Sequence, residues 1–373
     1  MSRRTTPPFR ADHVGSLLRP PELMRAREDL AAGRISAEEL RAVEDEAIRS
    51  AVTMQQEVGL QSATDGEFRR ASWHMDFIYQ LGGIEQAAGN ITVQFQSEAG
   101  AVEYTPAAIH VGEKVHLEHP IFAEDFGFLE AAVGEGVTPK LTIPSPSMVH
   151  YRGGRAAIDP DIYPDVEEFW SDLVTAYADE VRALADAGCT YLQFDDTSFA
   201  YLNDPRQREQ MAGKGEDAEH LHETYIRHLN EVLAGRPEGL AVTTHMCRGN
   251  FRSSWAAEGG YDFVAEALFG DLDVDAFFLE YDDARSGGFE PLRYVPSDKL
   301  VVLGLLTTQR GALEDADLLK RRIEEASRYI SVEQLCLSPQ CGFSSTSEGN
   351  TLSYDEEVAK LELIVETAAE VWG

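Results

Sequence analysis

The sequence predicts an α/β protein, and a (β/α)8 barrel is the arrangement that we prefer. Apolar strand-like segments alternate with amphipathic helix-like segments along most of the 373 residues, an order typical of parallel sheets with crossover helices. Polar residues close nearly every strand-like segment at its C-terminal end. Since only a closed barrel brings all of those ends to one mouth, we prefer it to the alternative, an open doubly wound sheet.

The eight strand-like segments share a short apolar run that ends in polar residues. They are residues 9–16, 60–67, 140–146, 189–196, 240–247, 276–282, 299–308 and 334–342. Between them, apolar residues recur at helical spacing. Helices are expected near 36–58, 166–187, 220–234, 261–270, 315–329 and 354–371. Ser36 with Glu39 three residues later is a capping-box pattern, which predicts the start of the first of these helices.

We expect one domain over residues 1–373, with an inserted region at roughly 88–135 after the second strand. Alternating polarity in this region predicts one or two β-hairpins, which would form a lid or a subunit contact in a homo-oligomer. His110, His116 and His119 lie within or beside it. We interpret them as solvated or hydrogen-bonded histidines, and a ligand cluster is the alternative.

The composition narrows the class of protein. With 65 Asp+Glu against 32 Lys+Arg, the formal net charge of −33 makes nucleic-acid and anionic-membrane binding unfavourable. No apolar run approaches the roughly 20 residues that span a bilayer, and the N-terminal segment has no apolar core of a secretory signal. The four cysteines show no disulfide-framework spacing. A cytoplasmic location is therefore expected.

Four residues after different strands suggest a metal site. They are His245, Cys247, Glu280 and Cys341, and two thiolates, an imidazole and a carboxylate make a plausible tetrahedral zinc site. A thiol substrate that binds such a zinc loses its proton and becomes a nucleophile near neutral pH. Other interpretations exist for single members, since a buried cysteine is usually a small hydrophobe and Glu280 stands in an acidic run.

Carboxylates close two other strands. Glu67 follows the second, and Asp195 with Asp196 closes the fourth; at a barrel mouth they suit capture of an ammonium group or acid–base work. Capping of the following helices is the alternative, above all for Asp196. Ser16 after the first strand could bind a carboxylate or stand in a plain turn. Together with thiolate activation, these groups describe a site for an amino acid that bears a thiol.

Six motifs in order then resemble a known family. HVGSLLRP, TDGEFRR, LQFDD, THMC, LEYDD and SPQCG resemble the catalytic C-terminal barrel of cobalamin-independent methionine synthase, and more closely its short single-barrel bacterial members, over about residues 10–372. The resemblance implies a (β/α)8 barrel and a zinc bound by His245, Cys247, Glu280 and Cys341. It also implies that Ser16 meets the carboxylate of homocysteine, while Glu67 and Asp195 hold its ammonium.

The sequence departs from the family pattern on the side of the methyl donor. The duplicated N-terminal barrel of the full-length enzyme is not in this sequence. Pro146, followed by Ser147, stands where the family has a tryptophan that stacks on the folate. Gln309 stands where a family histidine protonates the leaving group, and Thr307 where the family has an aspartate. Because glutamine is no acid near neutral pH, the donor half of the site is altered.

The expected function is a zinc-dependent methyl transfer to the thiol of homocysteine, which gives methionine. The donor is methyltetrahydrofolate, a methylcorrinoid or a simpler methyl compound. One alternative is a related zinc-dependent alkyl or epoxide thiol transferase, or a carbon–sulfur lyase, which would need no ammonium site. A second alternative is a non-catalytic zinc protein, since structural zinc sites usually have four protein ligands.

Overall fold

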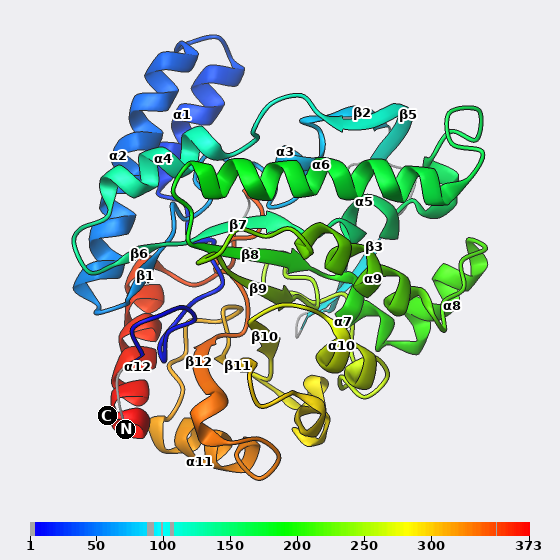
Figure 1. Cartoon of the computed structure of the whole chain (residues 1–373). Helices are drawn as coiled ribbons and strands as arrows, with labels where there is room; N and C mark the ends of the chain where they lie inside the picture. The colour runs from blue at the N-terminus through cyan, green and yellow to red at the C-terminus, as the bar shows by residue number, and fades with distance from the viewer. Residues whose placement is uncertain (1–3, 88–92, 98–99, 105–107, 348) are drawn as a thin grey trace.

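A parallel sheet of six strands forms the centre of the computed structural model (Figure 1), which describes residues 4–87, 93–97, 100–104, 108–347 and 349–373. The strand order is β12-β11-β10-β9-β8-β7, and all neighbours are parallel. The strands are β7 (Leu141–Pro144), β8 (Tyr191–Asp196), β9 (Ala241–Met246), β10 (Ala276–Glu280), β11 (Leu300–Leu306) and β12 (Leu335–Pro339). The α/β class and these six strands are confirmed.

The first two predicted strands are shorter than expected. The second is only β1 (Ser62–Ala63), paired in parallel with β6 (Thr138–Pro139) just before β7. The first is one isolated bridge from Ala11 to Leu337. The Asp12 carboxylate accepts hydrogen bonds from the backbone N–H groups of Phe9 (3.1 Å) and His13 (2.8 Å). Such local side-chain bonds compete with a strand ladder.

The segment of the first predicted strand and the segment around β1 are joined by single hydrogen bonds. The Leu17 N–H donates to the Gly66 carbonyl (3.1 Å), and the Ser62 hydroxyl donates to Asp12 Oδ1 (3.0 Å). In the described residues no regular ladder joins these two segments. Closure into a (β/α)8 barrel therefore stays a prediction.

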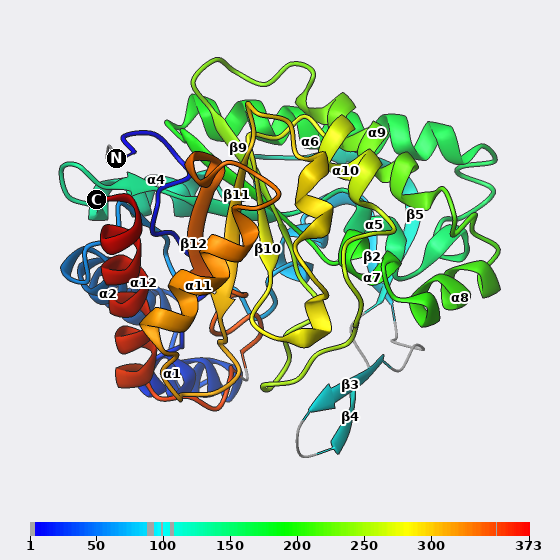
Figure 2. The ribbon, with the colours of Figure 1, turned by 90° about the horizontal axis from the view of Figure 1, so that it is seen from below.

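Helices flank the sheet (Figures 1 and 2), and nearly all apolar residues of its strands are buried. They are α1 (Pro21–Ala31), α2 (Ala37–Glu57), α3 (Met75–Ile78), α4 (Ala123–Ala132), α5 (Ser147–Tyr151), α6 (Val166–Asp186), α7 (Ser198–Leu202), α8 (Pro205–Gly213), α9 (Leu221–Leu233), α10 (Ala265–Asp271), α11 (Ala316–Ala326) and α12 (Tyr354–Trp372). The expected helices are confirmed, and so is the Ser36–Glu39 capping box. Within the described residues, none of the helices is both long and apolar enough to cross a membrane.

The predicted insertion contains two antiparallel pairs. β2 (Leu81–Ala87) pairs with β5 (Ala108–Leu117), and β3 (Val93–Ser97) pairs with β4 (Gly100–Tyr104); Figure 2 shows the second pair standing away from the main sheet. β2 starts before residue 88, and α4 occupies the end of the region at 88–135. Residues 88–92, 98–99 and 105–107 lie outside the described residues.

The hairpin of β3 and β4 is joined to the loop after β9. Gln96 and Trp255 exchange two backbone hydrogen bonds, of 2.7 and 2.9 Å, so the hairpin stands beside the C-terminal ends of the sheet strands. His110, His116 and His119 are all exposed, as their interpretation as solvated histidines requires. The insertion therefore contributes to the mouth of the fold through β3.

A buried carboxyl on α12 connects this helix to the segment after the first bridge. The backbone N–H of Leu18 donates to Glu357 Oε1 (3.0 Å), and Glu357 is 1% exposed. Burial raises the pKa of Glu357 from 4.5 to about 8. A carboxyl with a higher pKa in the folded protein lowers stability as pH rises from the unfolded toward the folded pKa.

We therefore expect Glu357→Gln to change how stability depends on pH. Between pH 6 and 8, the stability of the variant should rise relative to that of the parent protein by roughly 2 kcal/mol, because the amide has no proton to lose. Urea unfolding at the two pH values measures the difference. A stability difference that is the same at both pH values would show that this carboxyl does not titrate in that range.

Candidate metal centre and substrate cavity

Four predicted ligands come together at the C-terminal ends of three strands of the sheet, β9, β10 and β12. His245 lies in β9 with Cys247 just after it, Glu280 ends β10, and Cys341 follows β12. One donor atom from each lies within 4.8 Å of the others, and all four residues are buried. The parallel strands explain this grouping, because they end at the same edge of the sheet.

The chemistry of this cluster fits a zinc ion. The two thiols are free, with Sγ atoms 3.4 Å apart. Both ring nitrogens of His245 are buried and have no hydrogen-bond partner among the described residues, although buried polar groups are normally satisfied. Burial lowers the pKa of His245 to about 3, so the imidazole is neutral, as a ligand must be. One nitrogen, two sulfurs and a carboxylate oxygen are a zinc-type donor set.

The electrostatics of the acidic ligands also favour a cation here. The hydrogen bond with Cys341, followed by burial, raises the pKa of Cys247 well above its usual value. Burial raises the pKa of Glu280 to about 7, and its Oε1 accepts one hydrogen bond, from the Arg248 backbone (2.9 Å). A bound cation stabilises the ionised forms of such groups. The residues therefore fit the metal that the sequence predicts.

Two further carboxyls face the same cavity. Glu67 Oε1 accepts a hydrogen bond from Thr142 (2.9 Å), and Oε2 is buried with no partner among the described residues. Asp195 Oδ1 accepts one from Gln193 (2.7 Å). Burial raises the pKa of Glu67, and burial and then the charge of Glu67 raise that of Asp195 well above normal. Two adjacent buried carboxyls of this kind favour a cationic ligand between them.

The backbone holds Glu67 in an unusual conformation. Its φ is +60°, a left-handed value that is costly for a residue with a side chain and is found mostly where the surroundings enforce it. Asp65 Oδ1 accepts the Glu67 N–H (2.8 Å), so Asp65 fixes the turn. Arg70 lies 3.7 Å from Glu67 Oε1. This backbone conformation, held by Asp65, directs the Glu67 carboxyl into the cavity. The carboxyl therefore does not cap a helix.

The two remaining candidates from the sequence, Ser16 and Asp196, have different surroundings. Ser16 lines the cavity with Glu67 and Asp195, and its Oγ accepts the N–H of Ser344 (3.3 Å). A side chain at Gly342 would stand 2.0 Å from that oxygen, so glycine leaves room for it. Asp196 accepts hydrogen bonds from the first backbone N–H of α7 (2.6 Å) and the hydroxyl of Ser147 (2.5 Å), as the capping interpretation requires.

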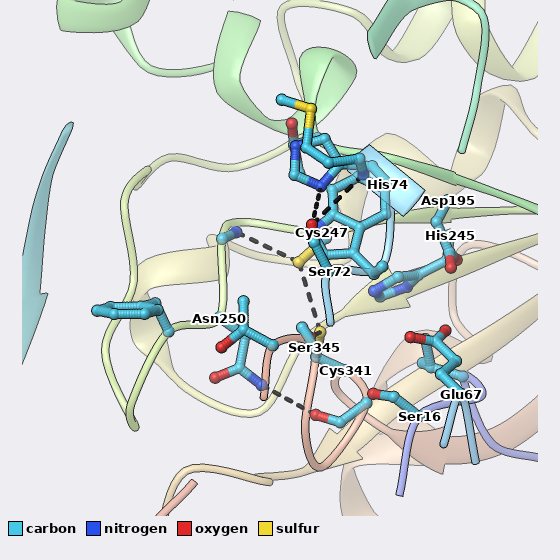
Figure 3. A pocket seen from close by; sticks show the side chains of 18 of the residues that line it. Ser16, Glu67, Ser72, His74, Asp195, His245, Cys247, Asn250, Cys341 and Ser345 are labelled. Carbon is cyan, nitrogen blue, oxygen red and sulfur yellow. Dashed lines mark hydrogen bonds between the residues drawn. The ribbon is translucent and has the colours of Figure 1, made fainter. Parts of the chain in front are cut away.

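One cavity of about 260 Å³ is bordered by both the metal cluster and the carboxyl pair. His245, Cys247 and Cys341 border it together with Ser16, Glu67 and Asp195, whereas Glu280 lies behind the lining. Figure 3 shows Glu67 and Asp195 to one side of the two thiols and Asn250 to the other. A molecule in this cavity would therefore reach the acidic pair and the metal cluster at once.

Sequence reasoning missed the opposite wall of the cavity. It consists mainly of residues from loops and short helices, with Phe95 from β3: Ser72, Trp73, His74, Met75, Asp76, Tyr79, Arg152, Tyr201, Asn250 and Phe251. No motif marks them, because their positions depend on how the loops fold. Pro146, Thr307 and Gln309, which stand at the family's donor positions, are not among the lining residues.

The protein thus belongs to the class of parallel α/β proteins that have a zinc-type donor set, here His–Cys–Glu–Cys, at the strand ends. Within that class the family is clear: residues 9–370 match the model of the cobalamin-independent synthase catalytic domain. The chain belongs to this family, as a short single-domain member.

Three relatives describe the similarity. The uncharacterized protein YxjG of Bacillus subtilis (strain 168) is 48% identical, over 99% of this chain and 96% of that protein. A crystal structure from Listeria monocytogenes, with the provisional name vitamin-B12-independent methionine synthase, is 40% identical with a TM-score of 0.79, covering 99% of both chains. The 5-methyltetrahydropteroyltriglutamate–homocysteine methyltransferase of Thermotoga sp. (strain RQ2) is 24% identical over 99% of this chain and 45% of that protein.

We predict that Cys341→Ala keeps the fold and loses zinc. Changes around metal ligands alone cost about 10–100-fold in affinity, so removal of a ligand should cost more. Metal analysis after dialysis against a weak chelator measures the zinc content, and circular dichroism checks the fold. Cys189→Ala is the matched control, because Cys189 is a buried cysteine outside the cluster. Full zinc occupancy in Cys341→Ala would rule out this ligand.

Proposed function

We propose that this protein is a zinc-dependent S-methyltransferase that transfers a methyl group to homocysteine and forms methionine. The observation that carries the proposal is the single cavity bordered by both the His–Cys–Glu–Cys cluster and the buried pair Glu67 and Asp195. Membership of the cobalamin-independent synthase family supports it, and so does the homocysteine methyltransferase named among the relatives.

The residues of the chain have distinct roles in this proposal. His245, Cys247, Glu280 and Cys341 would hold zinc, which lowers the pKa of a bound thiol so that the thiolate is available near neutral pH. Glu67 and Asp195 bind the ammonium group of the substrate, and the Ser16 hydroxyl binds its carboxylate. Fixing both ends of a short amino acid orients its sulfur toward the cluster, which favours attack on a methyl carbon.

The acidic pair distinguishes this function from its rivals. A thiol–epoxide transferase or a carbon–sulfur lyase that acts on simple thiols has no use for two buried carboxyls beside the metal cluster. A purely structural zinc site is closed, whereas three of the four ligands here border a cavity. These features favour catalysis on an amino-acid thiol.

The proposal also covers the two short strand segments outside the six-stranded sheet. We infer that the Ala11 bridge and β1 complete a (β/α)8 barrel as a single domain over residues 1–373, supported by the hydrogen bond from Leu17 to Gly66. The methyl donor is the open part of the reaction: methyltetrahydrofolate and a methylcorrinoid remain candidates beside simpler methyl compounds. A homo-oligomer and a cytoplasmic location stay predictions.

We expect zinc-loaded protein to form methionine from homocysteine and a methyl donor, measured by mass spectrometry. X-ray absorption should show an added sulfur neighbour at zinc when homocysteine binds, because the thiol enters the metal shell. An unchanged zinc shell together with no methionine from any donor would contradict the proposed function and favour a structural zinc.

A second prediction concerns recognition of the ammonium group. Glu67→Gln should raise the KM for homocysteine at least about tenfold, because an interaction with a charged group is worth roughly 1.5–3 kcal/mol. The control is a substrate change: 4-mercaptobutanoate lacks the ammonium group, and the parent protein should use it poorly. If Glu67→Gln leaves the preference for homocysteine over this thiol unchanged, Glu67 does not bind the ammonium.

A further inference from the structure

One part of the cavity wall contains neither the metal cluster nor the acidic pair, and its side chains are of a different kind. We call it the outer wall: Trp73, His74, Tyr79, Phe95, Arg152, Tyr201 and Phe251. It borders the same cavity as the thiols of Cys247 and Cys341 (Figure 3). Under the proposed function, a methyl donor must lie here, because the amino acid occupies the side of Glu67 and Asp195.

Arg152 gives this wall a positive charge. No carboxylate in the described part of the chain lies within ion-pair distance of its guanidinium, although the chain has 65 acidic residues. Its charge adds to the lowering of the pKa of His74 by burial and opposes the burial that raises the pKa of Tyr201, so the three side chains lie near one another. A half-buried guanidinium without a carboxylate suits a carboxylate on a ligand, which it can bind through two N–H groups.

Most of the rest of the wall is aromatic; Asp76 also borders the cavity, and its carboxylate accepts hydrogen bonds from the backbone N–H groups of Ala71 (3.0 Å) and Ser72 (2.6 Å). Trp73, Tyr79, Phe95, Tyr201 and Phe251 line the cavity, and the rings of Phe95 and Phe251 have centroids 5.4 Å apart. Aromatic faces attract cations, and several such rings around one site are typical of recognition of quaternary ammonium groups. An aromatic wall with one arginine thus matches a molecule with an onium centre and a carboxylate.

The protonation state of His74 also fits a molecule with an onium centre. His74 is the histidine of the outer wall; its Nε2 is buried with no partner among the described residues, and Ser72 Oγ lies 3.1 Å from its Nδ1. Burial lowers the pKa of His74 well below its usual value, so the imidazole is neutral and a poor acid. A leaving group that departs without a proton fits this wall, and an amine or sulfide released from an onium centre is such a group.

The size of the cavity limits the donor further. Pockets for drug-sized ligands usually measure about 300–1,000 Å³, and this cavity of about 260 Å³ must hold the amino acid as well. A donor of a few heavy atoms is the better fit.

From the outer wall we propose that the methyl donor is a compact onium carboxylate, with its carboxylate on Arg152 and its methylated nitrogen or sulfur against the aromatic rings. The inference rests on the proposed function and names the class of its second substrate. The homocysteine thiolate forms a bond to a donor methyl carbon while the bond from that carbon to the onium atom breaks. The electron pair stays on the onium atom, which leaves as a neutral amine or sulfide, and the thiol proton goes to solvent.

The binding test uses trimethylglycine and dimethylsulfoniopropionate in titration calorimetry with the zinc-loaded protein. Arg152→Gln should weaken binding at least about tenfold, as expected for loss of a charge-assisted contact. Arg152→Lys should weaken it less, because lysine keeps the charge but not the paired N–H groups. Arg252→Gln is the matched control, because Arg252 is exposed and does not line the cavity. Equal binding by the parent protein and a folded Arg152→Gln, or no binding by the parent, would overturn the assignment.

The activity test separates this inference from the proposed function. Methionine from trimethylglycine indicates an ammonium donor, methionine from dimethylsulfoniopropionate a sulfonium donor, and either supports the inference. Methionine only from methyltetrahydrofolate, its triglutamate or methylcobalamin overturns the inference and leaves the proposed function in place. Methionine from none of these donors, while homocysteine still enters the zinc shell, overturns the onium assignment alone.

Discussion

The site depends on the burial of polar groups that the protein itself does not fully satisfy. His245 lacks partners for both ring nitrogens, and Glu67 lacks one for Oε2. Leaving such groups buried costs roughly 1–3 kcal/mol each, so the fold must supply that stability through its apolar sheet and the helices around it. A metal ion beside His245 and an ammonium group beside Glu67, as we propose, would recover this cost.

Geometry and charge together divide the cavity into regions. The strand ends of β9, β10 and β12 set the metal cluster, and the turn after β1 with the end of β8 sets the acidic pair. Each region is tuned by burial, which raises the pKa of the carboxyls and lowers that of the histidines. Cations are favoured beside the carboxyls, whereas the outer wall adds one arginine and aromatic rings. The two sides of the cavity therefore differ in charge and in shape.

The inserted hairpin gives the cavity a wall that the sheet cannot provide. Phe95 of β3 borders the cavity, and the backbone bonds between Gln96 and Trp255 attach β3 to the loop after β9. Cys247 of the His–Cys–Glu–Cys cluster begins that same loop. Consequently the loop that begins at the cluster also carries the backbone contact to the hairpin.

The sequence by itself determined the elements and the chemistry. Helical spacing located α2, α6 and α12, and polar residues at strand ends identified His245, Cys247, Glu280 and Cys341, because the period of the hydrophobic pattern and the C-terminal convergence of parallel strands are local rules. Tertiary structure decided what those rules do not contain. The first predicted strand is reduced to a single bridge at Ala11, and loop packing placed Arg152, His74 and Phe95 on one wall. Residues far apart in the chain acquire a common role only through the folded backbone, so no local pattern marks them.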